Sequence, residues 1–302
     1  MKLNIEQNRS QGDPYVIKVK EKYYMYCTHN EGVHLYSSDD KINWKYRGLC
    51  FTKVDEKEYW APAVIEIDNK YYMYVSTMPI NESDTHQQRI LVAIADKPDE
   101  EFKFIKYILK PFSIDPHVVK SGNDLYIFYS LNDYDAKRAG TLIVLDKMKD
   151  PLEVENKPKV VVRATLDEEI FMKDRFKKGQ HWHTIEGAYY FRKGDYHYIL
   201  YSGNCFNSEN YYIGYSVAKG NTDNLLELDF KKYPNDNEYH PLLRKNEFEE
   251  GTGHNSMIIE NGHYYLIYHG RDYDTFTKNK DVRTARICEI SVDKEKLEVI
   301  KR

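Results

Sequence analysis

One phrase recurs five times along this chain of 302 residues. Each copy has a short extended run, a turn rich in Gly, Asn, Asp or Lys, and a second apolar run rich in tyrosine. The second run begins 10 residues after the phrase starts in four copies and 11 residues after it in the fourth copy. The five copies start at matched residues, namely Asp13, Ala61, Asp115, Glu186 and His254. A repeated unit of this kind constrains the fold more than any other feature, because each unit must bury its apolar face against its neighbours.

Each phrase predicts a β-hairpin, since two β-rich runs flank turn residues such as Asp68-Asn69 and Asn261-Gly262. A third and a fourth strand follow in most copies, as at Val33–Ser37 and Trp44–Tyr46. Units of three or four strands are typical of β-propeller blades. We therefore predict an all-β, five-bladed β-propeller in which residues 1–302 form a single domain. A stacked β-sandwich is the alternative fold.

The repeats start further apart than in most propellers, so we expect inserted loops, chiefly at 146–183 and 219–250. The Lys- and Glu-rich stretch Asp167–Lys178 is interpreted as a solvated loop, either helical or disordered. Tyrosine is unusually common, with 28 residues against 15 glycines. Tyrosine favours strands and carries a polar tip on an apolar ring. We expect the tyrosines of the second strands to pack between blades with their hydroxyls near solvent.

Charge and composition exclude several classes of protein. The formal net charge is −4, which argues against a nucleic-acid partner. No apolar run approaches the roughly 18 residues of a membrane span, so no membrane partner is expected. The first ten residues lack the pattern of a signal peptide, and the cysteines (Cys27, Cys50, Cys205 and Cys288) are widely spaced. We therefore expect reduced thiols and a cytoplasmic protein.

The matched starting positions include three carboxylates, Asp13, Asp115 and Glu186, and the imidazole of His254. The first strand of each propeller blade lines the central channel, so these side chains should meet at one cavity mouth. Each could instead be a turn former or a cap. Three carboxylates at matched positions favour chemistry, because bringing like charges together costs stability.

Two carboxyl groups across a cavity suit the hydrolysis of a glycosidic bond. One must be a protonated acid for the leaving oxygen, and the other an ionised base that activates water. Glu186 has the longest of the three side chains and lies near four rings that could desolvate it, those of His181, Trp182, His183 and Tyr189. Desolvation raises a carboxyl pKa, which favours Glu186 as the acid.

Five short segments carry a specific resemblance to a known family: Gly12-Asp13-Pro14, Trp60-Ala61-Pro62, Ile114-Asp115-Pro116, Ile185-Glu186-Gly187 and Gly253-His254-Asn255-Ser256. In order and in register with the repeats, they make the chain resemble glycoside hydrolase family 43. Members of that family are five-bladed propellers that hydrolyse arabinose- and xylose-containing glycans with inversion. The segment Arg283-Thr-Ala-Arg-Ile extends the likeness to almost the whole chain.

The resemblance implies a role for each matching residue. Asp13 would be the general base, Glu186 the general acid, and Asp115 the residue that tunes the pKa of the acid and orients it. Arg283 matches an arginine of the family that would contact Asp115 or a sugar hydroxyl. Arg286, three residues on and so on the opposite strand face, is the competing candidate.

Two further residues have two interpretations each. Trp60 either stacks on a sugar face or packs between blades. His254 matches a residue at the channel floor, often beside a calcium ion. A single histidine is a poor ligand for calcium, which prefers oxygen, so such an ion would be held mostly by water. A simple hydrogen-bonding role is the alternative, and the resemblance implies no cofactor required for the chemistry.

The resemblance predicts an exo-acting α-L-arabinofuranosidase that takes arabinose- or xylose-containing oligosaccharides, and a β-xylosidase is the close alternative. The insertions at 133–139 and 167–183 could wall its pocket. Ile114 and Gly187 stand where the retaining fructosidase relatives carry arginine and cysteine, so a fructan enzyme is not expected. Val282 precedes Arg283 where the endo-arabinanases of the family often have glycine, which weakens an endo-acting assignment. A non-catalytic carbohydrate-binding propeller is the second class of function. The signature of protein-interaction propellers of the WD type is absent from this chain, which argues against that class.

Overall fold

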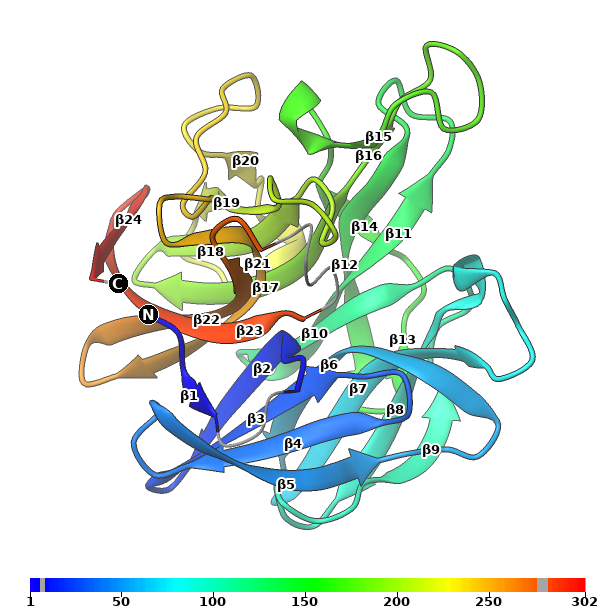
Figure 1. Cartoon of the computed structure of the whole chain (residues 1–302), viewed down its shortest axis with the longest axis vertical. Coiled ribbons are helices and arrows are strands. Elements are labelled where there is room, and N and C mark those ends of the chain that lie inside the picture. The colour runs from blue at the N-terminus through cyan, green and yellow to red at the C-terminus, as the bar shows by residue number, and fades with distance from the viewer. Residues whose placement is uncertain (6–8, 276–281, 302) are drawn as a thin grey trace.

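The computed structural model describes residues 1–5, 9–275 and 282–301. Within these ranges the strands form five sheets, taken here in chain order as the first to the fifth (Figure 1). The first sheet has the order β1-β5-β4-β3-β2 and contains β1 (Asn4–Ile5), β2 (Gly12–Val19), β3 (Lys22–Thr28), β4 (Val33–Ser38) and β5 (Asn43–Phe51). The second has the order β6-β7-β8-β9 and contains β6 (Glu56–Ile67), β7 (Lys70–Pro79), β8 (Arg89–Ala95) and β9 (Lys103–Tyr107).

The third sheet is the largest and holds the long insertion. It contains β10 (Ile114–Ser121), β11 (Asp124–Asp133), β12 (Gly140–Asp150), β13 (Glu153–Val154), β14 (Lys159–Val162), β15 (Ile170–Met172) and β16 (Trp182–His183). The fourth contains β17 (Ile185–Lys193), β18 (Tyr196–Gly203), β19 (Tyr212–Lys219) and β20 (Lys231–Lys232). The fifth contains β21 (Glu249–Glu260), β22 (His263–Asp272), β23 (Thr284–Asp293) and β24 (Lys296–Lys301). The predicted hairpins and their third strands are confirmed.

The innermost strands follow one another around a ring. β2 contacts β6, β6 contacts β10, β10 contacts β17, and β17 contacts β21, which returns to β2. The chain termini lie close together (Figure 1), and the amino group of Met1 donates to the carbonyl of Ile287 at 2.7 Å. The N-terminal segment therefore helps to join the first sheet to the fifth. This arrangement of sheets around an axis is an all-β propeller fold.

Each innermost strand has a bulge where its register with the second strand shifts, near the start of β2, β10 and β17 and near the middle of β6 and β21. The residue at the bulge has a positive φ in every sheet: 53° at Asp13, 46° at Ala61, 57° at Asp115, 66° at Gly187 and 43° at His254. In the fourth sheet this residue is Gly187, so Glu186 lies one position before it. That single-residue offset explains why the fourth phrase has a spacing of 11 residues.

The tyrosines of the second strands pack between sheets, as expected, and the hydroxyls of four of them are hydrogen-bonded to the next sheet. Four of them donate to the outer hairpin of the following sheet: Tyr26 to Pro98 O at 2.6 Å, Tyr74 to Pro151 O at 2.8 Å, Tyr126 to Asn224 Oδ1 at 3.2 Å, and Tyr198 to Lys294 O. A hydroxyl that is wholly or partly buried needs a partner, and the neighbouring hairpin supplies an oxygen acceptor. These bonds tie four successive pairs of sheets together.

The stretch Asp167–Lys178 is more ordered than the sequence suggested. It contains a 3-10 helix, η2 (Asp167–Glu169), and the strand β15. Glu169 is fully buried and forms an ion pair with Lys232 of β20. The interpretation as a solvated loop was therefore wrong for its first half, because a buried charge pair and a strand fix it to the third and fourth sheets.

The four cysteines are buried, and the described part of the chain contains no disulfide. The described helices are single 3-10 turns, and none has the length and apolar character needed to cross a membrane.

Candidate active site

The six candidate residues predicted from the sequence line one cavity of about 450 Å³: Asp13, Trp60, Asp115, Glu186, His254 and Arg283. Other lining residues include Thr28, Phe206 and Tyr211. The innermost strands of the five sheets bring five of these side chains to the same end of the ring, because each lies at or next to the bulge residue of its strand, and Arg283 comes from the residue before β23. The predicted convergence of the matched positions is therefore confirmed. Arg286 lies outside this group.

Asp13 is buried, with one guanidinium, one hydroxyl donor and two imidazoles around it. Arg283 Nη1 donates to Asp13 Oδ1 at 2.9 Å, and the hydroxyl of Thr28 donates to Oδ2 at 2.5 Å. His269 Nδ1 lies 3.2 Å and His254 Nδ1 3.5 Å from Asp13 Oδ1. Burial alone would raise the pKa of Asp13, but the Arg283 guanidinium holds it well below its usual range. The group is therefore ionised over most of the pH range.

Arg283 reaches Asp13 through the space above a glycine. A Cβ atom at Gly12 would overlap the Arg283 guanidinium, so a larger residue there would displace the guanidinium from this position. The direct partner of Arg283 is Asp13 and not Asp115, which differs from the expectation. Arg286 pairs instead with Glu249 at 3.4 Å and with Asp272 at 2.5 Å. Of the two arginines, Arg283 is the one that belongs to the site.

Asp115 lies deep in the cavity wall and contacts the backbone next to Glu186. Its Oδ2 accepts a hydrogen bond from the N–H of Gly187 at 3.1 Å. Burial first, and then the charges of Glu186 and Asp13, raise the pKa of Asp115 well above its usual value. Asp115 therefore fixes the bulge that carries Glu186 and interacts with it electrostatically.

Glu186 faces the cavity and has one close donor. The hydroxyl of Tyr211 donates to Glu186 Oε1 at 2.8 Å. Burial raises the pKa of Glu186 to about 7, against the opposing effect of the Tyr211 hydrogen bond. The Tyr211 ring occupies the place where a Cβ of Gly253 would lie, and it stacks on His269 with centroids 5.6 Å apart. Gly253 therefore gives Tyr211 its access to the carboxyl group.

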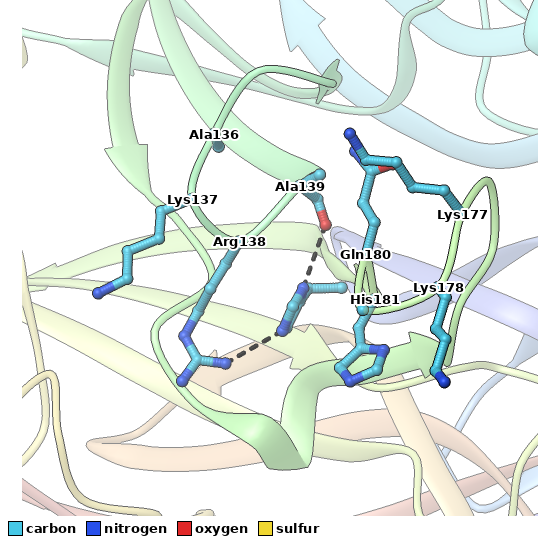
Figure 2. A pocket seen from close by; sticks show the side chains of 10 residues that line it. Ala136, Lys137, Arg138, Ala139, Lys177, Lys178, Gln180 and His181 are labelled. Carbon is cyan, nitrogen blue, oxygen red and sulfur yellow. Dashed lines mark hydrogen bonds between the residues drawn. The ribbon is translucent and has the colours of Figure 1, made fainter.

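The aromatic neighbours predicted for Glu186 are divided between two cavities. Trp182 lines a cavity with Glu186. His181 and His183 line a separate cavity of about 440 Å³ between the β11–β12 and β15–β16 loops, with Lys177 and Lys178 (Figure 2). Tyr189 donates its hydroxyl to Met257 O in the interior. Only Trp182 of the four therefore borders the acid, because neighbouring side chains on a strand point to opposite faces.

His254 and its surroundings are a poor fit to a calcium ion. The nearest carboxylate, Asp13, already pairs with Arg283, whereas calcium takes six to eight oxygen ligands. No group of three or more metal-ligating side chains occurs in the described ranges. Burial lowers the pKa of His254, which favours the neutral imidazole. A bound calcium ion therefore stays a prediction, and the side chains around His254 do not by themselves supply the oxygen ligands that it needs.

Trp60 borders both the main cavity and a second one of about 140 Å³. Its Nε1 donates to Glu58 Oε2 at 2.9 Å, which fixes the plane of the ring. The two cavities share Trp60, Ile114, Glu186 and Phe206. The predicted insertion 167–183 contributes to the second cavity, whereas none of the residues 133–139 lines either one.

Sequence reasoning missed Thr28, His269, Tyr211 and Phe206. A signal existed for the first two, because the sixth residue of the tyrosine-rich run is Thr28, Ser76, Ser130, Ser202 or His269 in the five copies. Three of these side chains accept the backbone N–H of the bulge residue in the next sheet: Thr28 from Ala61 at 2.8 Å, Ser202 from His254 at 2.7 Å, and His269 from Asp13 at 3.1 Å. No repeated pattern marks Tyr211 or Phe206.

The chain is similar to known proteins in both sequence and structure. The chain is 22% identical over 282 residues to the "Extracellular exo-alpha-(1->5)-L-arabinofuranosidase ArbA" of Cellvibrio japonicus, covering 85% of this chain and 78% of that protein. It is 23% identical to a "Xylosidase/arabinosidase" of Thermoclostridium stercorarium over 76% of this chain, and it spans half the length of that relative. The name of the first relative places that enzyme outside the cell and so gives no support to the expected cytoplasmic location.

The fold has a counterpart among solved structures. A crystal structure of a thermostable family-43 glycoside hydrolase matches with a TM-score of 0.84 and 25% identity, covering 100% of this chain and 96% of the other. The model of the family "Glycosyl hydrolases family 43" matches residues 7–294. Together with the five matching segments around one cavity, this match shows that the chain belongs to glycosyl hydrolase family 43.

Proposed function

We propose that this glycoside hydrolase is an inverting, exo-acting α-L-arabinofuranosidase that releases terminal arabinose from short oligosaccharides. Each of the five sheets would be one blade of a five-bladed propeller. The observation that carries the proposal is the contrast between two carboxyl groups at one cavity: Asp13 is held ionised, whereas the pKa of Glu186 is raised to about 7. That contrast supplies the base and the acid that hydrolysis with inversion requires.

The proposed reaction has one displacement step. Asp13 accepts a proton from a water molecule, whose oxygen forms a bond to the anomeric carbon. Glu186 donates its proton to the glycosidic oxygen as the bond from that oxygen to the anomeric carbon breaks. Asp115 would hold the backbone of Gly187 and so orient Glu186. Arg283 would keep Asp13 ionised and also lies where it can contact a sugar hydroxyl.

The cavity dimensions support action at a chain end. The main cavity has a volume of about 450 Å³, and the second, beyond Glu186, is smaller at about 140 Å³. A short substrate suits such a site better than a long polymer threaded through a groove. The Cellvibrio relative, which is named an exo-acting arabinofuranosidase, agrees with this choice.

A β-xylosidase is the second candidate, favoured by the name of the Thermoclostridium relative, a "Xylosidase/arabinosidase". The two candidates are separated by comparing nitrophenyl α-L-arabinofuranoside with nitrophenyl β-D-xyloside. We expect faster hydrolysis of the arabinofuranoside, and a preference for the xyloside would reverse the ranking. Hydrolysis of neither would contradict both candidates.

Stereochemistry and pH dependence test the mechanism. Proton NMR of the first-formed sugar should show the anomer opposite to that of the substrate, and a retained anomer would overturn the roles given to Asp13 and Glu186. We expect kcat/KM to fall as the pH rises through about 7, because Glu186 then loses the proton that it must donate.

A further inference from the structure

We propose that Arg175, on the loop between β15 and β16, positions the sugar that leaves when the bond is cut. This inference rests on the proposed function and adds a specificity-determining residue to it. Arg175 lines the cavity of about 140 Å³ together with Trp60, Trp182, His86 and Glu186. We call this cavity the outer cavity.

The position of the outer cavity relative to the carboxyl groups assigns it to the leaving group. Glu186 lines both cavities, whereas Asp13 and Asp115 line only the main one. A general acid lies between the sugar being cut and the group that departs, because its proton goes to the oxygen that joins them. The main cavity therefore holds the sugar attacked by water, and the outer cavity receives the leaving group.

Arg175 is arranged to donate hydrogen bonds in the outer cavity. Its guanidinium lies 4.7 Å from the centre of the Trp182 ring, and its Nη2 is 3.5 Å from His86 Nε2. His86 Nδ1 is in turn 2.6 Å from a carboxylate oxygen of Asp84. Among the residues with described positions, no carboxylate forms an ion pair with Arg175. A stacked guanidinium presents N–H groups along its edge, which suits hydroxyl oxygens of a ligand.

The Trp182 ring lies beneath the Arg175 guanidinium, and hydrogen bonds of the neighbouring residue of β16 hold it in place (Figure 2). His183, the neighbour of Trp182, has its Nδ1 3.1 Å from Ala139 O and its Nε2 3.1 Å from Arg138 Nη1. Gly140 pairs with His183, and a Cβ atom there would overlap the backbone of His183. The strand β16 is therefore fixed on the side away from the outer cavity, which holds Trp182 in place.

The chemistry of the outer cavity fits a sugar better than a simple alcohol or an ion. Indole rings of Trp60 and Trp182 offer flat apolar surface, and the guanidinium of Arg175 offers several donors in a plane. A sugar ring has apolar C–H faces and hydroxyl oxygens around its edge, so it can use both. A methyl group as the leaving part would use neither.

The test compares two substrates that differ only in the leaving group, a pentosyl disaccharide and the methyl glycoside of the same pentose. For Arg175→Ala we expect kcat/KM to fall about tenfold on the disaccharide, the loss of one or two charge-assisted hydrogen bonds. The methyl glycoside should keep its kcat/KM within about twofold. Lys178→Ala is the matched control, because Lys178 lies on the same loop but lines the other cavity. It should leave both substrates unchanged.

Equal losses on both substrates would overturn the role of Arg175, since a structural effect on Glu186 would slow both reactions. An unchanged disaccharide rate would overturn it as well. Failure of the proposed function looks different, because the wild-type protein would then hydrolyse neither substrate.

Discussion

The buried carboxyl groups on the two sides of the main cavity, Asp13 and Glu186, have opposite electrostatic surroundings. Asp13 has a guanidinium, a threonine hydroxyl and two imidazoles around it. Glu186 has a single tyrosine hydroxyl as a close partner, with the buried carboxyl of Asp115 nearby. Burial acts on both sides and would raise the pKa of either group. The neighbouring charges therefore decide which group is the base and which is the acid.

The difference follows from which sheets meet on each side. Around Asp13, the ring closes between the first and fifth sheets, and Arg283, His254 and His269 all come from the last part of the chain. Around Glu186, the third and fourth sheets meet, and each contributes a carboxylate at the start of its innermost strand. Closure of the ring thus gives Asp13 a cation in direct contact, Arg283, whereas burial keeps the two imidazoles neutral.

Removing the acid tests this contrast with the largest expected effect. Glu186→Gln should lower kcat/KM on a methyl pentoside by about 10²- to 10⁴-fold, the usual contribution of a general acid. A pentosyl fluoride needs no proton to release its leaving group, so its hydrolysis should be largely retained. Steady-state rates on the two substrates measure the difference.

The matched variant on the other side is Asp13→Asn. It removes the group that accepts a proton from water, a step that both substrates need. The loss should therefore be of similar size on the pentoside and on the fluoride. If the fluoride rescued Asp13→Asn instead of Glu186→Gln, the two roles would have to be exchanged.

Replacing Arg283 by an uncharged residue makes the electrostatic surroundings of Asp13 more like those of Glu186. Arg283→Met leaves Asp13 buried without its guanidinium, so the pKa of Asp13 should rise. The acid limb of the kcat/KM profile then moves to higher pH. The variant should therefore lose more activity than the wild type as the pH falls, about tenfold on the acid side for each pKa unit by which the limb moves.

Arg286→Met is the control for this experiment, because Arg286 lies three residues away but pairs with Glu249 and Asp272. It should leave the acid limb in place even if it lowers stability. An unmoved limb in Arg283→Met would mean that Arg283 acts on the substrate alone.

Much of this contrast could be predicted from the sequence, but its cause could not. The repeated phrase placed Asp13, Asp115 and Glu186 at one end of the innermost strands, because the repeat fixes the strand order and the position within each strand. The extra residue in the fourth spacing was also visible, and it marks Gly187 as the bulge residue. A repeated sequence pattern therefore predicts the course of the backbone.

Contacts that occur once in the fold were beyond sequence reasoning. Tyr211 lies just before β19, outside the repeated phrase, and reaches Glu186 only because Gly253 of the fifth sheet leaves room for its ring. The contact of Arg283 with Asp13 likewise depends on the missing Cβ of Gly12. Such contacts join residues far apart in sequence, and no local pattern encodes them.

The smallest expected effect concerns the one close donor on the acid side. Tyr211→Phe removes the hydrogen bond that stabilises the ionised form of Glu186. The pKa of Glu186 should therefore rise above about 7, and the basic limb of the kcat/KM profile should move to higher pH, with a change of about threefold in kcat/KM at its maximum. Tyr212→Phe is the control, because the next tyrosine donates to Glu169 and not to Glu186. A shift of the limb to lower pH in Tyr211→Phe would show that the hydroxyl instead stabilises the protonated acid, and the contrast between the two sides would then rest on burial and charge alone.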